Sequence, residues 1–207
     1  MEEKNVLSEE QKKIYIELKL QGCVDSKEEL FKKFNLDKDK NIGTIGKYIR
    51  NRFSITEENY ELLQENEGRE IQHIKSLYNN DERKSGFKTL LRFYNWYKKE
   101  SVPLKTCCYC GVKESNLKKY FNEENIQYVE ARQRGKVLEI ERVVTAPKSK
   151  NLYTEENCKL ACYVCNNAKS DFISPANFKP IAKGISEFWK ENGIEVEFPN
   201  NSTIWNK

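Results

Sequence analysis

Residues 157–171 read NCKLACYVCNNAKSD, and this stretch decides the fold predicted for the second half of the chain. It contains one cysteine pair of the form CxxC, and a second such pair lies upstream, with 51 residues between Cys110 and Cys162. A zinc ion takes a tetrahedron of soft or borderline ligands, which two CxxC pairs supply without straining either loop. The sequence therefore predicts a structural Zn²⁺ held by Cys107, Cys110, Cys162 and Cys165.

The other three cysteines leave part of this prediction open. Cys108 is adjacent to Cys107 and competes with it as a ligand. Cys23 and Cys158 fit better as small buried apolar residues. The alternative to zinc is that one pair is redox-active or merely buried. An odd total of 7 cysteines argues against complete disulfide pairing, and a reducing compartment favours metal binding.

Between the cysteine pairs, residues 138–144 read LEIERVV, in which apolar and charged residues alternate. A period of two predicts a strand, which we place from about residue 135 to 145. Strand geometry puts Glu139 and Glu141 on one face and Arg142 on the other. Downstream, residues 158–162 are predicted to form a return strand, and Asn166 is predicted to open a helix.

The whole chain is predicted to be an α+β protein. Helical periodicity and capping boxes dominate residues 1–100, with one helix running from Asp81 or Ser85 through Tyr97. Val102-Pro103 ends this region, so a domain boundary is expected near residue 100. Residues 101–207 are then a zinc-bound module with C-terminal helices. In that module Ser174-Pro175 is a capping pair, and a last helix covers residues 181–192.

Composition narrows the class of protein without naming a partner. The net charge of +4 over 207 residues is mild, and 38% hydrophobic residues are typical of a soluble globular chain. The basic excess is local, with 10 basic and 5 acidic residues in 131–183. No signal peptide and no apolar run of ~20 residues is visible, so we expect no membrane association and a cytoplasmic location.

The order of these motifs resembles the HNH, or ββα-metal, endonuclease family in its zinc-knuckle form. The resemblance covers about residues 104–173, and it is carried by the first CxxC pair, LEIER, Asn157 and CxxCNNAK. The family usually has an Asp-His dipeptide on its first strand. Here Glu141 and Arg142 stand in its place, so the upstream half departs from the family pattern.

The resemblance implies a role for each matching residue. Glu141 stands where the family has its metal-binding acid, and Asn166 where it has the second ligand of a catalytic Mg²⁺ or Mn²⁺. Asn157 matches the residue that holds the metal loop in shape, and Lys169 the helix lysine found near the phosphate. Arg142 replaces the histidine that activates water. The predicted catalytic residues are thus Glu141, Arg142, Asn157, Asn166 and Lys169.

Three interpretations of Arg142 stay open, because arginine remains protonated and is a poor general base. In the first interpretation, Arg142 clamps a phosphate or stabilises the transition state. In the second, it marks a nuclease fold that has lost catalysis. In the third, it is an ordinary surface arginine paired with a glutamate. Under the first interpretation the base must come from elsewhere. Tyr153, Glu139 and His73 are the candidates, although a lone histidine in a helical region is more often structural.

A basic stretch in the N-terminal half is similar to a helix-turn-helix. Lys47, Arg50 and Arg52 lie on its second predicted helix, where they would contact DNA in the major groove. The alternative is a helical hairpin with a solvated lysine face.

Together these features predict a metal-dependent DNA endonuclease of the kind found in restriction or phage defence. DNA is the expected partner, and the oligomeric state is open, with a dimer as one alternative. The alternative function is a catalytically inactive zinc module that binds DNA or protein.

Overall fold

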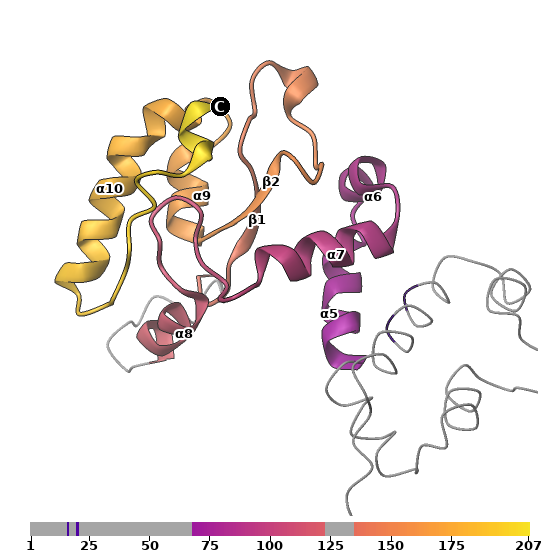
Figure 1. Cartoon of the computed structure of the whole chain (residues 1–207), viewed down its shortest axis with the longest axis horizontal. Coiled ribbons are helices and arrows are strands. Elements are labelled where there is room, and N and C mark those ends of the chain that lie inside the picture. Colours follow the sequence, from indigo (N-terminus) through magenta and orange to yellow (C-terminus); the bar gives the residue numbers. More distant parts are fainter. Residues whose placement is uncertain (1–15, 17–19, 21–67, 123–134) are drawn as a thin grey trace, which may run out of the picture. The chain divides into compact units, whose positions relative to one another are not determined.

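The computed structural model of the chain describes residues 16, 20, 68–122 and 135–207 (Figure 1). The predicted DNA contacts Lys47, Arg50 and Arg52, and the helix-turn-helix around them, lie outside the described residues. The chain divides into two units between Asn95 and Trp96, inside a helix. None of the helices in the described ranges combines the length and the apolar composition that a membrane crossing needs.

The helical unit contains α5 (Arg69–Tyr78), α6 (Asp81–Phe87) and the first half of α7 (Leu90–Glu100). Asn80 caps α6 by accepting a hydrogen bond from the backbone N–H of Arg83. The rings of Phe87 and Phe93 pack edge to face with centroids 4.9 Å apart. The single helix predicted from Asp81 or Ser85 to Tyr97 is wrong, because Lys88 has a φ of 66° and separates two helices.

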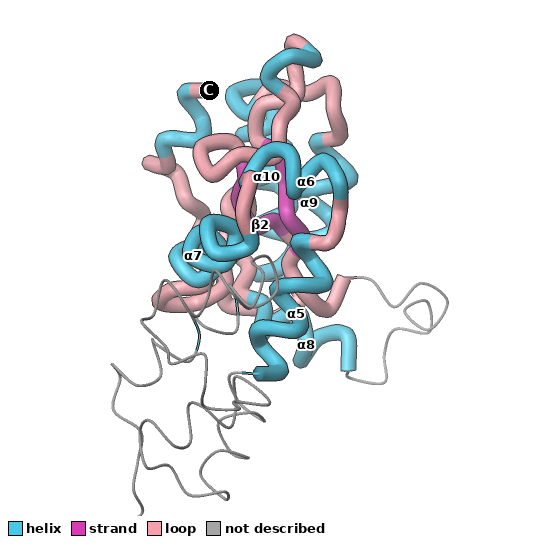
Figure 2. The backbone as a smooth tube through the Cα atoms, turned by 90° about the vertical axis from the view of Figure 1, so that its right-hand side faces the viewer, coloured by secondary structure: helices cyan, strands magenta, loops and turns pink. Residues whose placement is uncertain are grey.

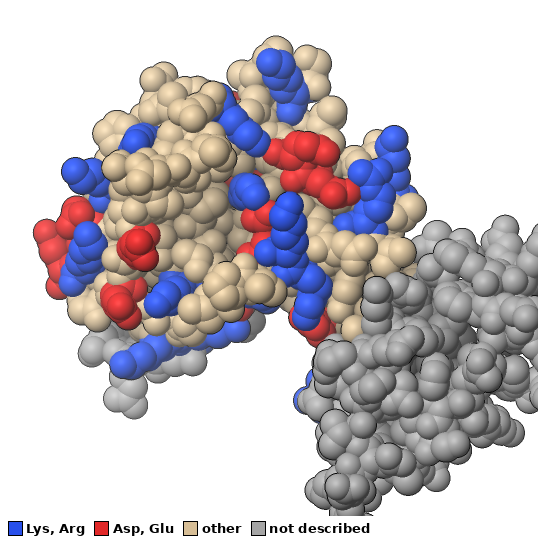
Figure 3. Space-filling view, in the orientation of Figure 1, with Lys and Arg blue, Asp and Glu red and all other residues tan. Residues whose placement is uncertain are grey.

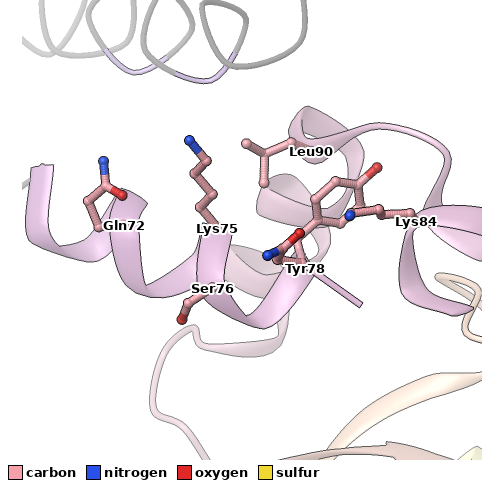
Figure 4. A pocket seen from close by; sticks show the side chains of 7 residues that line it. Gln72, Lys75, Ser76, Tyr78, Lys84 and Leu90 are labelled. Atoms are coloured by element: carbon pink, nitrogen blue, oxygen red, sulfur yellow. The ribbon is translucent and has the colours of Figure 1, made fainter. Parts of the chain in front are cut away.

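A hollow of about 430 Å³ lies in this unit between α5, α6 and the start of α7. Figure 4 shows the polar side chains that surround it, among them Lys75, Tyr78 and Lys84. Burial raises the pKa of Tyr78 above its ordinary value. Among the described residues, none of those predicted to form a functional site lines this hollow.

The second unit combines helices with a small sheet, which confirms the predicted α+β class. Strands β1 (Glu139–Arg142) and β2 (Cys158–Ala161), magenta in Figure 2, pair antiparallel. Glu141 lies opposite Lys159 in this pairing. Helix α9 (Tyr163–Lys169) follows β2 and packs on β1, so the order is β, β, α. The unit also contains α8 (Glu114–Asn122), which the sequence did not predict, α10 (Pro175–Glu191), and the 3-10 turns η2 (Lys148–Lys150) and η3 (Thr203–Asn206).

Strand β1 is shorter than the strand that the alternating pattern predicted. Hydrogen bonds with side chains from other segments explain where it begins and where it ends. Before the strand, the N–H of Leu138 donates to the Glu114 carboxylate at 3.1 Å, not to a strand partner. After it, the side-chain oxygen and nitrogen of Asn157 bond the backbone N–H and C=O of Val144 at 2.8 and 3.0 Å. Side chains therefore satisfy the N–H of Leu138 and both backbone groups of Val144, and pairing with β2 covers only Glu139–Arg142.

Of the two helices after β2, α9 begins earlier than predicted, whereas α10 begins at the predicted capping pair. Helix α9 starts at Tyr163, not Asn166, because Cys162 caps it and its sulfur accepts from the N–H of Cys165. The chain leaves the helix at Ser170, which has a φ of 54°. Helix α10 starts at Pro175 after the Ser174 cap, as the capping pair indicates. The helix predicted for residues 181–192 is therefore the later part of α10 and not a separate helix.

The C-terminal segment packs against the first cysteine pair. The ring of Tyr109 contacts Phe178 of α10 and Trp205 of η3, with centroids 5.1 and 5.9 Å away. Gly111 has a φ of 80°, and a Cβ there would lie 1.9 Å from the carbonyl oxygen of Glu197. Glycine is thus required at this turn both by backbone conformation and by the close approach of the C-terminal segment.

Candidate metal centre and candidate active site

The two cysteine pairs meet as one buried cluster, formed by Cys107, Cys110, Cys162 and Cys165. Their four sulfur atoms lie within 4.8 Å of one another, and those of Cys110 and Cys162 are 3.7 Å apart. Thiolates around a tetrahedral zinc, with Zn–S bonds of about 2.3 Å, are separated by about 3.8 Å. The four-cysteine cluster could therefore hold a structural metal such as zinc.

Short local hydrogen bonds shape the first half of the cluster. The N–H of Cys107 donates to the carbonyl of Val112 at 2.8 Å, and the N–H of Gly111 donates back to Cys107 at 3.0 Å. This tight turn brings the two sulfur atoms of the pair together. The second half is supplied by Cys162, which follows β2 and caps α9, and by Cys165 in the first turn of α9.

Cys108 and Cys158 lie outside the cluster, although both are near it in sequence. The backbone N–H of Cys108 donates to the carbonyl of Leu160 in β2. Burial, reinforced by the charge on Cys107, raises the pKa of the Cys108 thiol well above its ordinary value. Of the two neighbouring candidates, it is Cys107 that belongs to the cluster.

Glu141 is almost completely buried, with 6% of its surface exposed. One carboxylate oxygen, Oε1, accepts from the Tyr109 hydroxyl at 3.2 Å and pairs with Lys169 Nζ at 2.9 Å. Burial raises the pKa of Glu141, and the nearby Lys169 acts against that rise. The other oxygen, Oε2, accepts no hydrogen bond from any residue in the described ranges, so it is the oxygen available to a ligand.

Lys169 is fully buried, and its ammonium group makes its contacts with acceptors inside the protein. Besides its ion pair with Glu141, Nζ donates to the backbone carbonyls of Arg142 and Ser170, each at 3.3 Å. An ammonium group has three N–H donors, and three acceptors surround this one. In this conformation Lys169 contacts the buried acid and the backbone, and its side chain has no exposed surface.

Asn166 lies on α9 and is oriented by the first glutamate of β1. Its side-chain nitrogen donates to Glu139 Oε2 at 2.7 Å. The amide oxygen of Asn166 forms no hydrogen bond within the part of the chain that the structure describes. Glu139 and Glu141 are two residues apart on β1 and both contact α9, which is the shared face expected from strand alternation. We call Glu139, Glu141, Asn166 and Lys169 the β1–α9 site.

Asn157 holds the loop between the two strands. Its side-chain nitrogen donates to the carbonyls of Val144, Lys150 and Leu152 at 3.0, 3.1 and 2.9 Å, and its oxygen accepts from the N–H of Val144 at 2.8 Å. These contacts are within the loop, so Asn157 acts on its shape.

Arg142 lies at the end of β1, beside the β1–α9 site. Its guanidinium carbon is 4.6 Å from the ring centroid of Tyr153, and its Nη2 is 3.7 Å from Asp171 Oδ1. Two of the three candidate bases are thus already engaged, Tyr153 by Arg142 and Glu139 by Asn166. The third, His73, lies on α5 in the helical unit.

Two residues of the site were missed by the sequence-based prediction. Tyr109 stands between two cysteines of the sequence CCYC, where a tyrosine inside a metal turn was the available signal. Asp171 follows the predicted lysine by two residues, but its pairing with Arg142 depends on the end of α9. No local pattern indicates that pairing.

A β-β-α unit with a four-cysteine cluster is the arrangement expected for the HNH class of endonucleases. No family model matches this chain, and no curated protein matches it. Comparison with solved structures finds similarity to the rare-cutting HNH restriction endonuclease PacI. The identity is 25% and the TM-score 0.42, and the match covers 60% of this chain and 79% of that chain.

Proposed function

We propose that this protein is a metal-dependent endonuclease that hydrolyses phosphodiester bonds in DNA. The proposal rests on two side-chain oxygen atoms, one of Glu141 and one of Asn166, that neighbouring residues orient as metal ligands. Glu141 is held through Oε1 by Tyr109 and Lys169, and Asn166 is held through its nitrogen by Glu139. These contacts leave Oε2 of Glu141 and the amide oxygen of Asn166 available, and neighbours that orient ligands in this way are typical of metal sites.

The donor set suits a hard divalent ion. A carboxylate and an amide oxygen are ligands that Mg²⁺ and Mn²⁺ prefer. Such an ion, when bound, neutralises charge that develops on the phosphate and lowers the pKa of water. Glu141 and Asn166 would hold it, while Lys169, buried behind Glu141, keeps the carboxylate in place.

Arg142 is proposed to bind the scissile phosphate and to stabilise its charge. Guanidinium matches the geometry of phosphate oxygens and stays protonated at all relevant pH values. These properties suit charge stabilisation and exclude Arg142 as the base. The stack on Tyr153 fixes the position of the guanidinium, so less conformational freedom is lost when a phosphate binds.

We also propose a cellular location, a mode of DNA contact and a biological role for the protein. Thiolate clusters persist in a reducing compartment, which favours the cytoplasm. On the face shown in Figure 3, Lys and Arg side chains are interspersed with acidic ones. Contact with DNA is therefore proposed to depend on a few placed cations, namely Arg142 and the N-terminal Lys47, Arg50 and Arg52. A role in restriction or phage defence, as a monomer or a dimer, is part of this proposal.

A plasmid cleavage assay with Mg²⁺ or Mn²⁺ tests the proposal. Glu141→Ala and Asn166→Ala should each lower the rate by at least about 100-fold, because each removes a ligand of the charge-stabilising ion. Asn167→Ala is the matched control, since Asn167 is the exposed neighbour on α9 and its amide bonds only the carbonyl of Tyr163. Equal rates in all three variants would refute the assignment of the ligands.

The second candidate function is a zinc module that binds DNA without cutting it. The buried pair of Lys169 and Glu141 favours it, because the carboxylate is already neutralised by a protein cation. A parent protein that binds DNA but cuts no plasmid with either metal would support this candidate. Arg142→His would then be informative, since a gain of cleavage would identify the missing base as the defect.

A further inference from the structure

Asp171 is an acid outside the β1–α9 site that pairs with Arg142, and it lies in the turn after α9. Its Oδ1 is 3.7 Å from Arg142 Nη2, a distance that is too long for a good hydrogen bond. The Asp171 side chain is 68% exposed and that of Arg142 is 22% exposed. The Asp171 side chain is therefore weakly held in this pair, whereas the Arg142 side chain is mostly buried.

The backbone around Asp171 is better fixed than its side chain. The hydroxyl of Thr145 donates to the Asp171 carbonyl at 2.7 Å, which ties this turn to the loop after β1. A groove of about 760 Å³ runs between these two segments, and Asp171 lies on its lining with Leu152 and Phe172. The carboxylate can therefore rotate away from Arg142 without moving the backbone.

A carboxylate and a phosphate oxygen compete for the same donors. The Arg142 guanidinium is held against the ring of Tyr153, and its N–H groups suit either anion. An ion pair this exposed contributes little stability, so a phosphate group can displace the acid at small cost.

We propose that Asp171 is an internal counter-ion of Arg142, which a phosphate group of the substrate must displace before it binds. The inference rests on the proposed role of Arg142 as a phosphate ligand. Asp171 lowers the affinity of this position for every phosphate group. DNA that makes few other contacts is therefore held weakly, and a phosphate that is well placed by other contacts still displaces the acid.

The test uses the full chain and four variants, Asp171→Asn, Arg142→Gln, the two combined, and Glu187→Gln. Glu187 is the matched control, because it is a half-exposed acid on α10 paired with Lys190 and its change alters net charge equally. DNA affinity is measured by fluorescence anisotropy without added Mg²⁺ or Mn²⁺. Inorganic phosphate is titrated in parallel and followed by NMR at the Arg142 side-chain N–H.

Asp171→Asn should tighten binding of both DNA and inorganic phosphate by about two- to fivefold, as expected for removal of one exposed ion pair. Glu187→Gln should change neither affinity by as much, and the combined variant should bind like Arg142→Gln. A gain that is equal in Asp171→Asn and Glu187→Gln, or that persists without Arg142, would overturn the proposal. So would absence of any tightening in either titration.

The two titrations separate this inference from the proposed function. If no form of the protein binds DNA but Asp171→Asn tightens phosphate binding at Arg142, the counter-ion role stands and the nuclease proposal fails. If the parent cuts DNA but neither affinity responds to Asp171→Asn, the nuclease stands and the counter-ion role fails. Thermal unfolding of each variant checks that the fold is kept.

Discussion

The four-cysteine cluster and the β1–α9 site both include residues of α9 but are organised differently. In the cluster, identical side chains converge and all four are buried. The β1–α9 site instead combines two glutamates with an asparagine and a lysine, and neighbours of another kind orient its proposed ligands, Tyr109 for Glu141 and Glu139 for Asn166. The cluster needs only the right spacing of one residue type, whereas the site needs a set of long-range contacts.

The two regions are therefore expected to respond differently when one of their residues is substituted. Loss of one thiolate removes a shared ligand, so the whole cluster is expected to lose its metal. Loss of one orienting group at the β1–α9 site leaves the other groups in place and weakens one contact. Effects of substitution should therefore be all-or-none in the first region and graded in the second.

The largest effect is expected for Cys162→Ser, which removes one of the four predicted metal ligands, although a serine can still cap α9. Metal content should fall to near zero, and residues 96–207 should lose cooperative thermal unfolding, because structural zinc supplies about 10 kcal/mol or more in small metal-bound modules. Cys108→Ser is the control and should keep one zinc per chain. A Cys162→Ser protein with full zinc content would contradict the assignment of the ligands.

Lys169→Met should be next in size, because it leaves the Glu141 carboxylate buried without its cation. Removing one partner of a buried ion pair costs about 3–5 kcal/mol in the free energy of unfolding. Tyr109→Phe deletes only a neutral donor to the same oxygen and should cost about 1 kcal/mol. Urea unfolding measures both, and equal losses would show that the ion pair contributes no more than the hydroxyl.

Asn157→Asp should destabilise the loop after β1 by about 2 kcal/mol. The change keeps the oxygen that accepts from Val144, but it removes the donor to three carbonyls. Asn167→Asp is the matched control, because it makes the same change at an exposed asparagine whose amide, within the described residues, bonds only the carbonyl of Tyr163. If the two variants unfold at the same urea concentration, Asn157 does not hold the loop.

The smallest effect is expected at Glu139, which orients Asn166 without touching the buried pair. Glu139→Ala should weaken Mn²⁺ binding by about tenfold, the low end of the usual loss when the residue behind a ligand is removed. Glu139→Gln should recover part of this, because its carbonyl oxygen still accepts from Asn166. Mn²⁺ binding followed by electron paramagnetic resonance gives the values, and unchanged affinity in both variants would count against a positioning role.

Much of the fold was predictable because its signals are local. The spacing of each CxxC pair, the alternation around Glu141 and the Ser174-Pro175 cap all depend on residues near one another in the chain. The ends of β1 were not predictable in this way. They depend on Glu114, which bonds Leu138 across 24 residues, and on Asn157, which bonds Val144 across 13.

The sequence by itself determined which residues could hold a metal and which face of the strand carries both glutamates. Only the tertiary structure decided how the charges are paired. It buried Lys169 against Glu141, placed the Tyr109 hydroxyl on that acid across 32 residues, and set Asp171 beside Arg142. Periodicity and ligand spacing are properties of a short segment, but the partner of a buried charge depends on which segments the folded chain brings together.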